Sequence, residues 1–268
     1  RDDLSYDVTV MDNLCSESSS REYMRDDVEY WIDDVRNIMH AKDAQYDFDV
    51  IYHLAALARI QPSFKDPLTY LSIDIQGTAS VCEFARHAGA RLVYAGSSSA
   101  YGGPFLNPYA FAKYTGEQVC QLYHEVYNMS TVVARFFNVY GDRQPTTGAY
   151  ATVVGVFEKQ IRSNEDLTVT EQRRDFTHID DIVRGFAALG EKDWSVNDTT
   201  WIFNIGTGKN YSINELAQMF RGKIKYIPAR PGEARTTLAD VSLLLEHTSW
   251  KPRHNLSQYV EDYLSNLG

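Results

Sequence analysis

The chain has 268 residues, of which 44% are hydrophobic and 13% aromatic, and it carries a formal net charge of −10. A chain of this size can bury a full core, either as one domain or as one large and one small lobe. The acidic balance argues against binding to nucleic acid or to an anionic membrane surface, because neither attracts a negatively charged protein. A net negative charge does not exclude a local basic pocket for a phosphorylated ligand.

The cysteines and the hydropathy pattern indicate the compartment. Cys15, Cys82 and Cys120 are widely spaced, which favours free thiols in a reducing compartment over a disulfide framework or a zinc site. The sequence shows neither a secretory signal pattern nor an apolar run long enough to span a bilayer. We therefore expect a cytoplasmic enzyme with no membrane partner and no metal.

Apolar runs alternate with helical patterns through the first half of the chain. Strands are predicted over residues 6–11, 28–32, 49–56, 91–95 and 131–137, and helices over 67–87 and 109–128. Gly89 is expected to end the first of these helices. The alternation predicts an α/β fold with a doubly wound parallel sheet, in which ligands bind at the carboxyl ends of the strands.

From Gly148 onward the predicted elements are shorter. A helix is expected over residues 150–162, a strand over 167–170 and another over 201–205. The segment 173–181 leads into a helix that runs to residue 189, and Ser212 is a predicted N-cap for a helix that ends near 220. Gly206 to Gly208 is interpreted as a turn.

Tyr109 and Lys113 are the candidate chemical centre. They stand four residues apart on a predicted helix, so both side chains can point at one spot. A tyrosine keeps its proton until pH about 10, and a nearby cation lowers that pKa by favouring the phenolate. Ser97 follows a buried strand and can complete an acid-base relay on a substrate alcohol.

Asp12 ends the first predicted strand, and two interpretations of it are open. In a nucleotide-binding βαβ unit, an acid at the end of the second strand binds the adenosine ribose hydroxyls. The glycine fingerprint of such a unit lies about 20 residues earlier. Only eleven residues precede Asp12, so either that strand and its Gly-rich turn are missing from this sequence or Asp12 is an ordinary turn residue.

Other polar groups have plain structural interpretations when each is taken alone. A single histidine such as His53 is more often a satisfied core residue than a catalyst. Arg230 and Arg235 flank a turn at a density that suits phosphate binding, although a charge run is usually a solvated surface.

Ten motifs in a fixed order carry a family resemblance. They occur at residues 10–14, 53–56, 77–78, 97–102, 109–113, 135–141, 148–151, 174–176, 203–206 and 230–233. Together they resemble the extended short-chain dehydrogenase/reductase family, and within it the nucleotide-sugar 4-epimerases that act on UDP-glucose or UDP-N-acetylglucosamine. The resemblance covers nearly the whole chain and favours a binding role for Asp12 and Arg230.

The resemblance implies NAD as cofactor, an NAD-binding domain over residues 1–145 and a mainly nucleotide-sugar-binding lobe over 146–268, with some chain crossing back to the first domain. It implies Tyr109 as the base, Ser97 as its partner and Lys113 on the nicotinamide ribose. The remaining cofactor positions it implies are Asp12, Asn13, Asp34, Val35, Leu54, Ala55, Ala56, Asp74 and Phe137. The implied substrate-binding residues are Ser98, Ser99, Asn138, Tyr150, Arg174, Arg230 and Glu233.

The implied reaction is inversion of C4 of a UDP-sugar through a transient 4-keto intermediate. The related 4,6-dehydratases need an extra acid, and the matching positions here are Ser97, Ser98 and Ser99, which cannot act as carboxylic acids at neutral pH. A non-catalytic protein that binds a nucleotide sugar or NAD is the alternative from another class. The implied assembly is a homodimer formed through a four-helix bundle of the helices near residues 68–87 and 109–127.

Four departures from the family pattern stand out. The Gly-rich turn is absent, and the small Gly-containing turn usual between Thr170 and Glu171 is also missing. The interval from Gly103 to Tyr109, where a loop normally covers the substrate, is shorter than in the family. Asp74 stands where the family commonly has Asn beside the cofactor.

Overall fold

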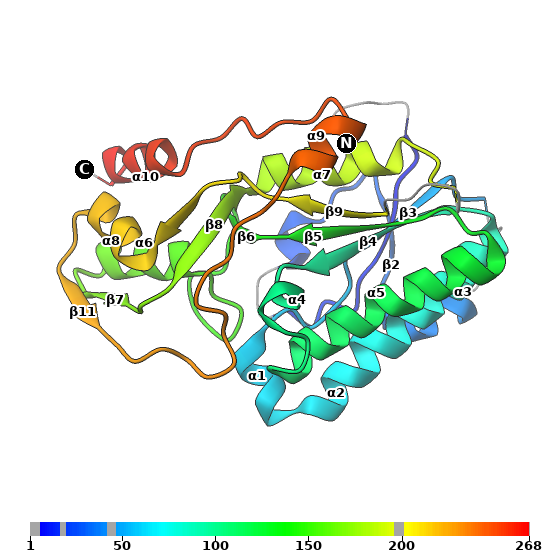
Figure 1. Cartoon of the computed structure of the whole chain (residues 1–268), viewed down its shortest axis with the longest axis horizontal. Helices are drawn as coiled ribbons and strands as arrows, with labels where there is room; N and C mark the ends of the chain where they lie inside the picture. The colour runs from blue at the N-terminus through cyan, green and yellow to red at the C-terminus, as the bar shows by residue number, and fades with distance from the viewer. Residues whose placement is uncertain (1–5, 17–19, 42–46, 196–200, 268) are drawn as a thin grey trace.

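The central feature of the fold is a four-stranded parallel sheet. The computed structural model describes residues 6–16, 20–41, 47–195 and 201–267 (Figure 1). The sheet has the order β3-β4-β5-β9, formed by Val50–His53, Arg91–Ser97, Thr131–Phe136 and Ile202–Ile205. β1 (Thr9–Met11) and β2 (Glu29–Trp31) make a separate parallel pair, and the described residues hold no strand that joins it to β3.

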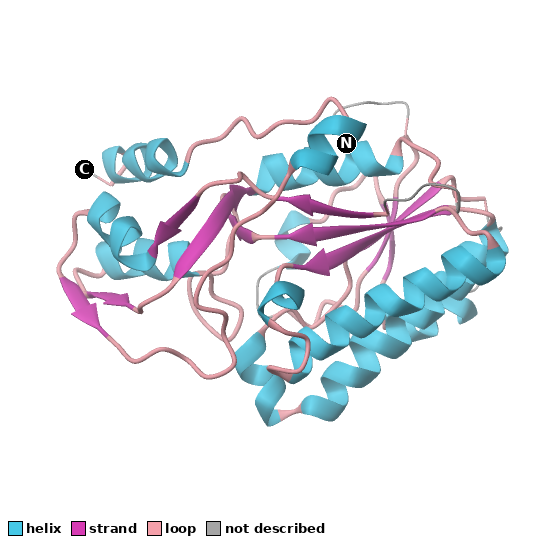
Figure 2. Ribbon diagram, in the orientation of Figure 1, coloured by secondary structure: helices cyan, strands magenta, loops and turns pink. Residues whose placement is uncertain are grey.

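Helices cover both faces of this sheet, as the doubly wound pattern predicts (Figures 1 and 2). On one face lie η2 (Val35–His40), α2 (Pro67–Leu71), α3 (Gly77–Ala88) and α5 (Pro108–Tyr127), and on the other α7 (Ile179–Gly190) and α9 (Ser242–His247). A short 3-10 helix, η1 (Ser20–Tyr23), lies between β1 and β2. The expected mixed α/β fold with a parallel, Rossmann-like sheet is confirmed.

The predicted helix over 67–87 is observed with an irregular middle. A π-helical segment, Ser72–Gln76, joins α2 to α3. Asp66 caps α2 by accepting a hydrogen bond from the Thr69 N–H, and Gly89 ends α3 in the left-handed conformation at φ 66°. A π segment inside a helix is often found at a functional site, because it shifts the side chains that follow it around the helix axis.

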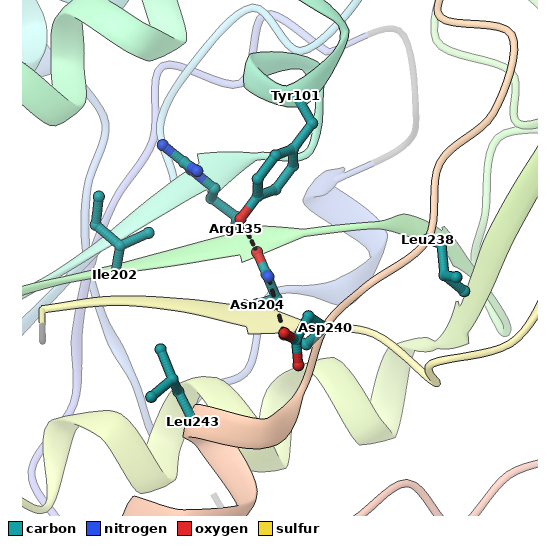
Figure 3. Close-up of a pocket in the computed structure, with 7 residues that line it drawn as sticks. All are labelled: Tyr101, Arg135, Ile202, Asn204, Leu238, Asp240 and Leu243. Carbon is teal, nitrogen blue, oxygen red and sulfur yellow. Dashed lines mark hydrogen bonds between the residues drawn. The ribbon is translucent and has the colours of Figure 1, made fainter.

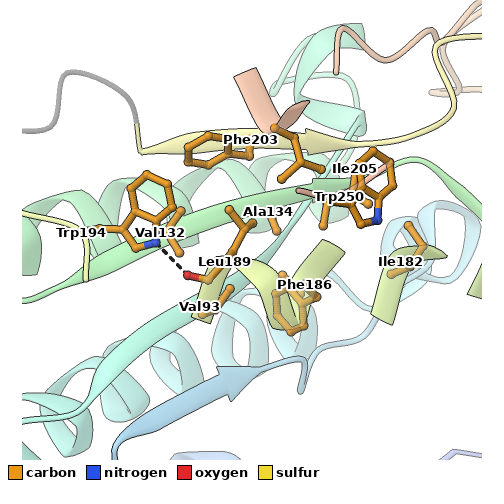
Figure 4. Close-up of a cluster of buried hydrophobic side chains, with 12 residues drawn as sticks. Val93, Val132, Ala134, Ile182, Phe186, Leu189, Trp194, Phe203, Ile205 and Trp250 are labelled. Atoms are coloured by element: carbon orange, nitrogen blue, oxygen red, sulfur yellow. Dashed lines mark hydrogen bonds between the residues drawn. The ribbon is translucent and has the colours of Figure 1, made fainter. Parts of the chain in front are cut away.

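The core between the sheet and α7 explains the long apolar runs in the sequence. Val93, Val132, Phe203 and other sheet side chains pack against Phe186 and its neighbours on α7 (Figure 4). The full cluster is Val93, Ala95, Val132, Ala134, Ile182, Phe186, Leu189, Trp194, Phe203, Ile205, Leu244 and Trp250. The indole N–H of Trp194 donates to the Leu189 carbonyl at 2.8 Å, so this large ring is buried without an unsatisfied donor.

Shorter elements of the second half build a second hydrophobic core. One sheet has the order β10-β8-β6, from Asn210–Ser212, Arg173–His178 and Asn138–Tyr140, and β7 (Leu167–Val169) pairs with β11 (Ile224–Tyr226). α6 (Val153–Arg162), α8 (Ile213–Phe220) and α10 (Leu256–Ser265) pack against these strands. Ser212 and Glu215 form the capping box of α8, so the predicted N-cap is observed.

β8 is a strand that the sequence pattern did not predict. Its first residues are Arg173, Arg174 and Asp175. Three charged residues in a row do not resemble a buried strand in sequence, yet most of β8 is buried. The Asp175 carboxylate is fully buried and accepts hydrogen bonds from the N–H groups of Thr207, Gly208 and Ala239 at 2.9, 2.9 and 3.2 Å. These bonds hold the predicted turn at 206–208 and offset the cost of burying the charge.

Three short elements surround the start of α5. They are α1 (Ile60–Lys65), α4 (Ser99–Gly102) and a turn in which the Leu106 N–H donates to the Gly103 carbonyl at 3.2 Å. This turn fills the interval that the sequence showed to be short. Asn107 caps α5 through the Ala110 N–H, and Pro108 occupies the first helical position. Within the described residues, no helix is both long and apolar enough to cross a bilayer.

Candidate active site

Tyr109 and Ser97 meet at the carboxyl end of β4. Ser97 is the last residue of β4, and Tyr109 lies in the first turn of α5. The Tyr109 hydroxyl donates to Ser97 Oγ across 3.2 Å, and the Tyr109 backbone N–H donates to Ser63 Oγ at 3.2 Å. The predicted base and its predicted partner are therefore in direct contact, and a second serine fixes the start of the helix that carries the base.

The electrostatics around Tyr109 differ from the sequence expectation. Burial raises the pKa of Tyr109, while the Ser97 hydrogen bond lowers it, the Asp74 charge raises it and the Arg59 charge lowers it. Arg59 is the cation among the largest influences on this pKa, whereas the sequence had pointed to Lys113. The protein groups by themselves hold Tyr109 in its neutral form, because burial outweighs the one nearby cation.

Lys113 lies one helical turn beyond Tyr109 and is buried, with 5% of its surface exposed. Its ammonium group sits over the ring of Tyr94, 4.6 Å from the ring centroid. Burial lowers the pKa of Lys113, and the Asp74 and Glu117 charges raise it. The ammonium group therefore contacts an aromatic face, and the two acids act on it through their charge.

Asp74 lies in the π segment and is almost fully buried, with 1% exposure. One carboxylate oxygen accepts the Leu57 N–H at 2.7 Å, and the other has no hydrogen-bond partner. Burial raises its pKa to about 6, against the opposing effect of the Lys113 charge. The sequence placed Asp74 beside the cofactor, and in the structure its charge and that of Lys113 act on each other's pKa.

His53 ends β3 and is a satisfied core residue. The Thr78 hydroxyl donates to the Asp74 carbonyl at 2.6 Å and therefore accepts from His53 Nε2–H at 3.0 Å. Burial, reinforced by the Lys113 charge, lowers the pKa of His53 to about 3, so the ring is neutral at physiological pH. This network ties the end of β3 to the π segment that carries Asp74.

Four buried polar atoms without a hydrogen-bond partner belong to the residues of this region. They are Arg59 Nε, Tyr70 Oη, Asp74 Oδ2 and Ser99 Oγ. The Arg59 charge lowers the pKa of both Tyr70 and Tyr109, and the Asp74 charge raises both, which places the two phenols near this arginine and this acid. Buried polar groups are normally paired, so a gathering of unpaired ones indicates a site built for a polar ligand.

Arg59 and Tyr70 are functional candidates that the sequence pattern did not single out. Arg59 stands between an Ala-rich segment and α1, where a lone arginine looks like a surface residue. Tyr70 is one of several apolar-face residues of α2. The available signal was the length of the apolar stretch 53–60, in which one arginine is the only charged side chain apart from the histidine at its start.

The predicted adenine and ribose residues lie at the carboxyl ends of β1 and β2. Asp12 directly follows β1 and is exposed, and its carboxylate accepts the Leu14 N–H at 2.7 Å. Asp34 caps η2 and binds Arg36 in a two-pronged ion pair at 2.8 Å for each contact. That pair and a bond from Asn13 lower the pKa of Asp34.

The other predicted cofactor residues lie at strand ends. Leu54 follows β3 and is 58% exposed, with Ala55 and Ala56 partly buried beside it. Phe137 follows β5, is 4% exposed and packs against the Tyr101 ring. Val35, the first residue of η2, is partly buried against Gly77.

Several predicted substrate residues are brought together from distant parts of the chain. Arg174 Nη2 lies 3.6 Å from Glu233 Oε2, and Gln61 and Gln172 donate to the same glutamate at 3.3 and 3.1 Å. Tyr150 is joined to Arg59 through its backbone carbonyl. The remaining predicted substrate residues are Arg230, which is exposed, Asn138 at the start of β6, and Ser98, whose N–H donates to the Phe136 carbonyl at 3.0 Å.

A separate hollow of about 360 Å³ lies beside β5 and β9 (Figure 3). Its lining residues are Tyr101, Arg135, Ile202, Asn204, Leu238, Asp240 and Leu243. The Tyr101 hydroxyl donates to Asn204 Oδ1 at 2.8 Å, and Asn204 donates to the Asp240 carbonyl at 2.9 Å. None of the predicted catalytic groups lines it, so we place the active site at Tyr109, where the unpaired buried groups gather.

Comparison with known proteins gives a consistent result. Residues 2–206 match the model of the NAD dependent epimerase/dehydratase family. A putative UDP-glucose 4-epimerase of Methanocaldococcus jannaschii is 30% identical over 96% of this chain and 89% of its own length.

Two solved structures share the fold of this chain and about a quarter of its sequence. UDP-glucuronic acid 4-epimerase from Bacillus cereus, in complex with UDP-glucuronic acid and NAD, is 25% identical, with TM-score 0.81 over 98% of this chain and 92% of its own. UDP-N-acetylglucosamine 4-epimerase from Methanobrevibacter ruminantium M1, in complex with UDP-N-acetylmuramic acid, is 26% identical, with TM-score 0.81 over 97% and 91%. The sugars differ among the three, whereas the reaction class does not.

Proposed function

The chain belongs to the NAD dependent epimerase/dehydratase family, and we propose that it inverts C4 of a UDP-sugar through a transient 4-keto intermediate. The observation that carries this proposal is the Tyr109 to Ser97 hydrogen bond of 3.2 Å at the carboxyl end of β4. The expected cofactor, NAD, is the cofactor of the family. The three relatives described above all act as, or are named for, UDP-sugar 4-epimerases.

The nicotinamide half of NAD fits the residues around Tyr109. Asp74 Oδ2 is buried without a partner among the described residues, Lys113 is buried and electrostatically coupled to Asp74, and Ala55 and Ala56 put small side chains at the end of β3. Lys113 would hold the nicotinamide ribose. NAD bound there would supply reversible hydride transfer at C4 of the sugar.

Proton transfer is then the task of Tyr109. Ionised, it takes the proton of the sugar 4-hydroxyl, and Ser97 accepts or donates a hydrogen bond at the same oxygen. Since burial raises the pKa of Tyr109 in the protein alone, ionisation needs further positive charge. A bound nicotinamide ring would supply that charge.

The second half of the chain is proposed to hold the nucleotide. Arg174 is buried and paired with Glu233, so its guanidinium is fixed in one orientation. We retain the proposed division into residues 1–145 for NAD and 146–268 for the nucleotide sugar. β9 belongs to the second segment and pairs with β5 of the first, which is the crossing of the chain that this division includes.

A homodimer through α3 and α5 is proposed from the exposed apolar side chains on α5. Leu122 is 53% and Val126 is 62% exposed, whereas Val119 and Tyr123 pack on their own core. Light scattering of the native chain and of Leu122→Glu tests this arrangement. A monomeric native protein would end it.

The reaction is tested with purified protein, NAD and UDP-glucose, UDP-N-acetylglucosamine or UDP-glucuronate, by following formation of the 4-epimer with NMR. Tyr109→Phe keeps the ring and removes the hydroxyl, and loss of general base catalysis is expected to cost on the order of 100- to 10,000-fold in kcat. Tyr226→Phe removes a hydroxyl bonded only to Asn214 on an exposed strand and serves as the control. Unchanged turnover in Tyr109→Phe removes this residue from the mechanism.

A further inference from the structure

Arg59 is a mostly buried guanidinium without an acidic partner. Its Nη1 donates to the Ala58 carbonyl at 3.3 Å and its Nη2 to the Tyr150 carbonyl, and its Nε is buried with no hydrogen-bond partner. Among the residues that the structure describes, no carboxylate lies within ion-pair distance of it. Burial lowers its pKa, and only the phenols of Tyr109, Tyr150 and Tyr70 oppose that effect. Such a cation is costly to bury unless an anion joins it.

The position of Arg59 is fixed by backbone on both sides. It immediately precedes α1, whose Ser63 Oγ accepts the N–H of Tyr109, so the first turn of α1 is tied to the base. The guanidinium lies over the Tyr150 ring, 5.9 Å from the centroid, and this aromatic contact holds its plane. The two carbonyl bonds leave the Nε–H free while the head group is held in place. The arginine is therefore preorganised for a ligand group rather than for packing.

The anion that Arg59 would bind is part of the sugar. Arg174 and Arg230 are the cations assigned to the diphosphate, and they lie on β8 and on the loop after β11. Arg59 instead precedes α1, whose Ser63 accepts the backbone N–H of Tyr109, and its charge lowers the pKa of that phenol, which is proposed to act on the sugar ring itself. A carboxylate matches the planar edge of a guanidinium and can take the free Nε–H with a charge-assisted hydrogen bond.

We propose that Arg59 makes this enzyme selective for nucleotide sugars whose sugar carries a carboxylate, by pairing with that carboxylate in the sugar pocket. This inference rests on the proposed 4-epimerase function and adds the substrate class to it. A neutral sugar leaves the guanidinium unpaired and is the poorer ligand. Of the sugars named above, a uronic acid carries its acid directly on C5, the ring carbon next to C4.

The test compares UDP-glucuronate with UDP-glucose, which differ only in the carboxylate and the hydroxymethyl group at that carbon. Dissociation constants are measured by calorimetry with the NAD-loaded protein, and turnover is measured separately. The native protein is expected to bind UDP-glucuronate on the order of 10- to 100-fold tighter than UDP-glucose. Arg59→Gln is expected to abolish this preference and to leave the affinity for UDP-glucose and for UDP unchanged.

Matched variants separate a ligand contact from a structural role. Arg59→Lys keeps the charge but loses the planar edge, and its preference is expected to shrink without vanishing. Arg221→Gln removes an exposed guanidinium, 73% accessible, and is expected to keep the full preference. If Arg59→Gln fails to bind UDP, the lysine variant decides, since an undiminished preference there overturns the proposal.

Two other results also overturn it: equal affinity of the native protein for the two sugars, or an equal loss for both in Arg59→Gln. The second result would assign Arg59 to the base or to the fold instead. Binding selectivity that depends on Arg59, without turnover of any UDP-sugar, supports the inference and refutes the epimerase function. The two conclusions can therefore fail separately.

Discussion

Asp74→Asn is expected to stabilise the protein at alkaline pH and to have little effect at acid pH. The native carboxyl is 1% exposed, and one of its oxygens has no partner. Burial raises its pKa from 3.8 to about 6, so the folded state favours the protonated form. Asn has the shape of that protonated form, and its carbonyl can still accept the Leu57 N–H.

The magnitude follows from the displaced pKa. A shift of about two units corresponds to about 3 kcal/mol of unfavourable free energy in the ionised folded state. The favourable protonated state is fully present below pH about 4, where the carboxyl is protonated both in the folded and in the unfolded chain. It is lost as the pH rises through about 6. Asp74→Asn should therefore gain up to about 3 kcal/mol over the native protein at pH 8 and nearly nothing at pH 4.

Urea unfolding of both proteins across this pH range measures the difference. Asp7→Asn removes the same charge from an exposed position and should show no comparable pH dependence. A native protein that is more stable than Asp74→Asn at pH 8 would refute the reasoning, as would a stability difference independent of pH. Because the Asp74 charge also raises the pKa of Tyr109, the acid limb of kcat/KM should move to lower pH in the variant.

Two further predictions concern buried groups. Glu117→Gln should lower the free energy of unfolding by about 3 to 5 kcal/mol, because Glu117 is fully buried and binds Arg135 through two contacts of 2.9 and 2.6 Å. Glu83→Gln serves as the control, because Glu83 belongs to a partly exposed ion pair with Arg86. In the same urea titration its free energy of unfolding should fall by less than about 1 kcal/mol. The buried His53 ring has a pKa of about 3 and resists protonation, so the native protein should lose about 4 kcal/mol of stability as the pH falls from about 6.5 through 3. His53→Gln should not show this loss, because glutamine does not titrate. If the free energies of unfolding of the native protein and of His53→Gln fall by the same amount between pH 6.5 and pH about 3, this second prediction is contradicted.

Patterns with strong local causes were predictable from the sequence. The apolar run before Ser97 forms β4, and the helix predicted over 109–128 is observed as α5, one residue longer at its start. Both elements are determined mainly by residues close in the sequence: an unbroken apolar run for β4, and helical periodicity with an N-terminal cap for α5. The contact between Ser97 and Tyr109 follows because both lie at the same end of the sheet.

Features set by tertiary contacts were not predictable in this way. β8 begins with charged residues that are buried because Asp175 meets three backbone N–H groups some thirty or more positions away. Arg59 reaches Tyr150 across 91 positions, and the sequence pattern gave no reason to join them. The burial that raises the pKa of Tyr109 in the protein alone was also not predictable, because spacing on a helix does not report how deeply a phenol is buried.

The pairing of β9 with β5 has a consequence for how the polypeptide is made. Val133 of β5 lies opposite Ile202 of β9, so almost seventy residues must emerge from the ribosome after β5 before that strand gains its second neighbour. Until then one side of β5 offers unpaired backbone groups and apolar side chains to other chains. A nascent or truncated product that stops short of β9 is accordingly the species most exposed to aggregation, and a chaperone would have to shield it at that edge.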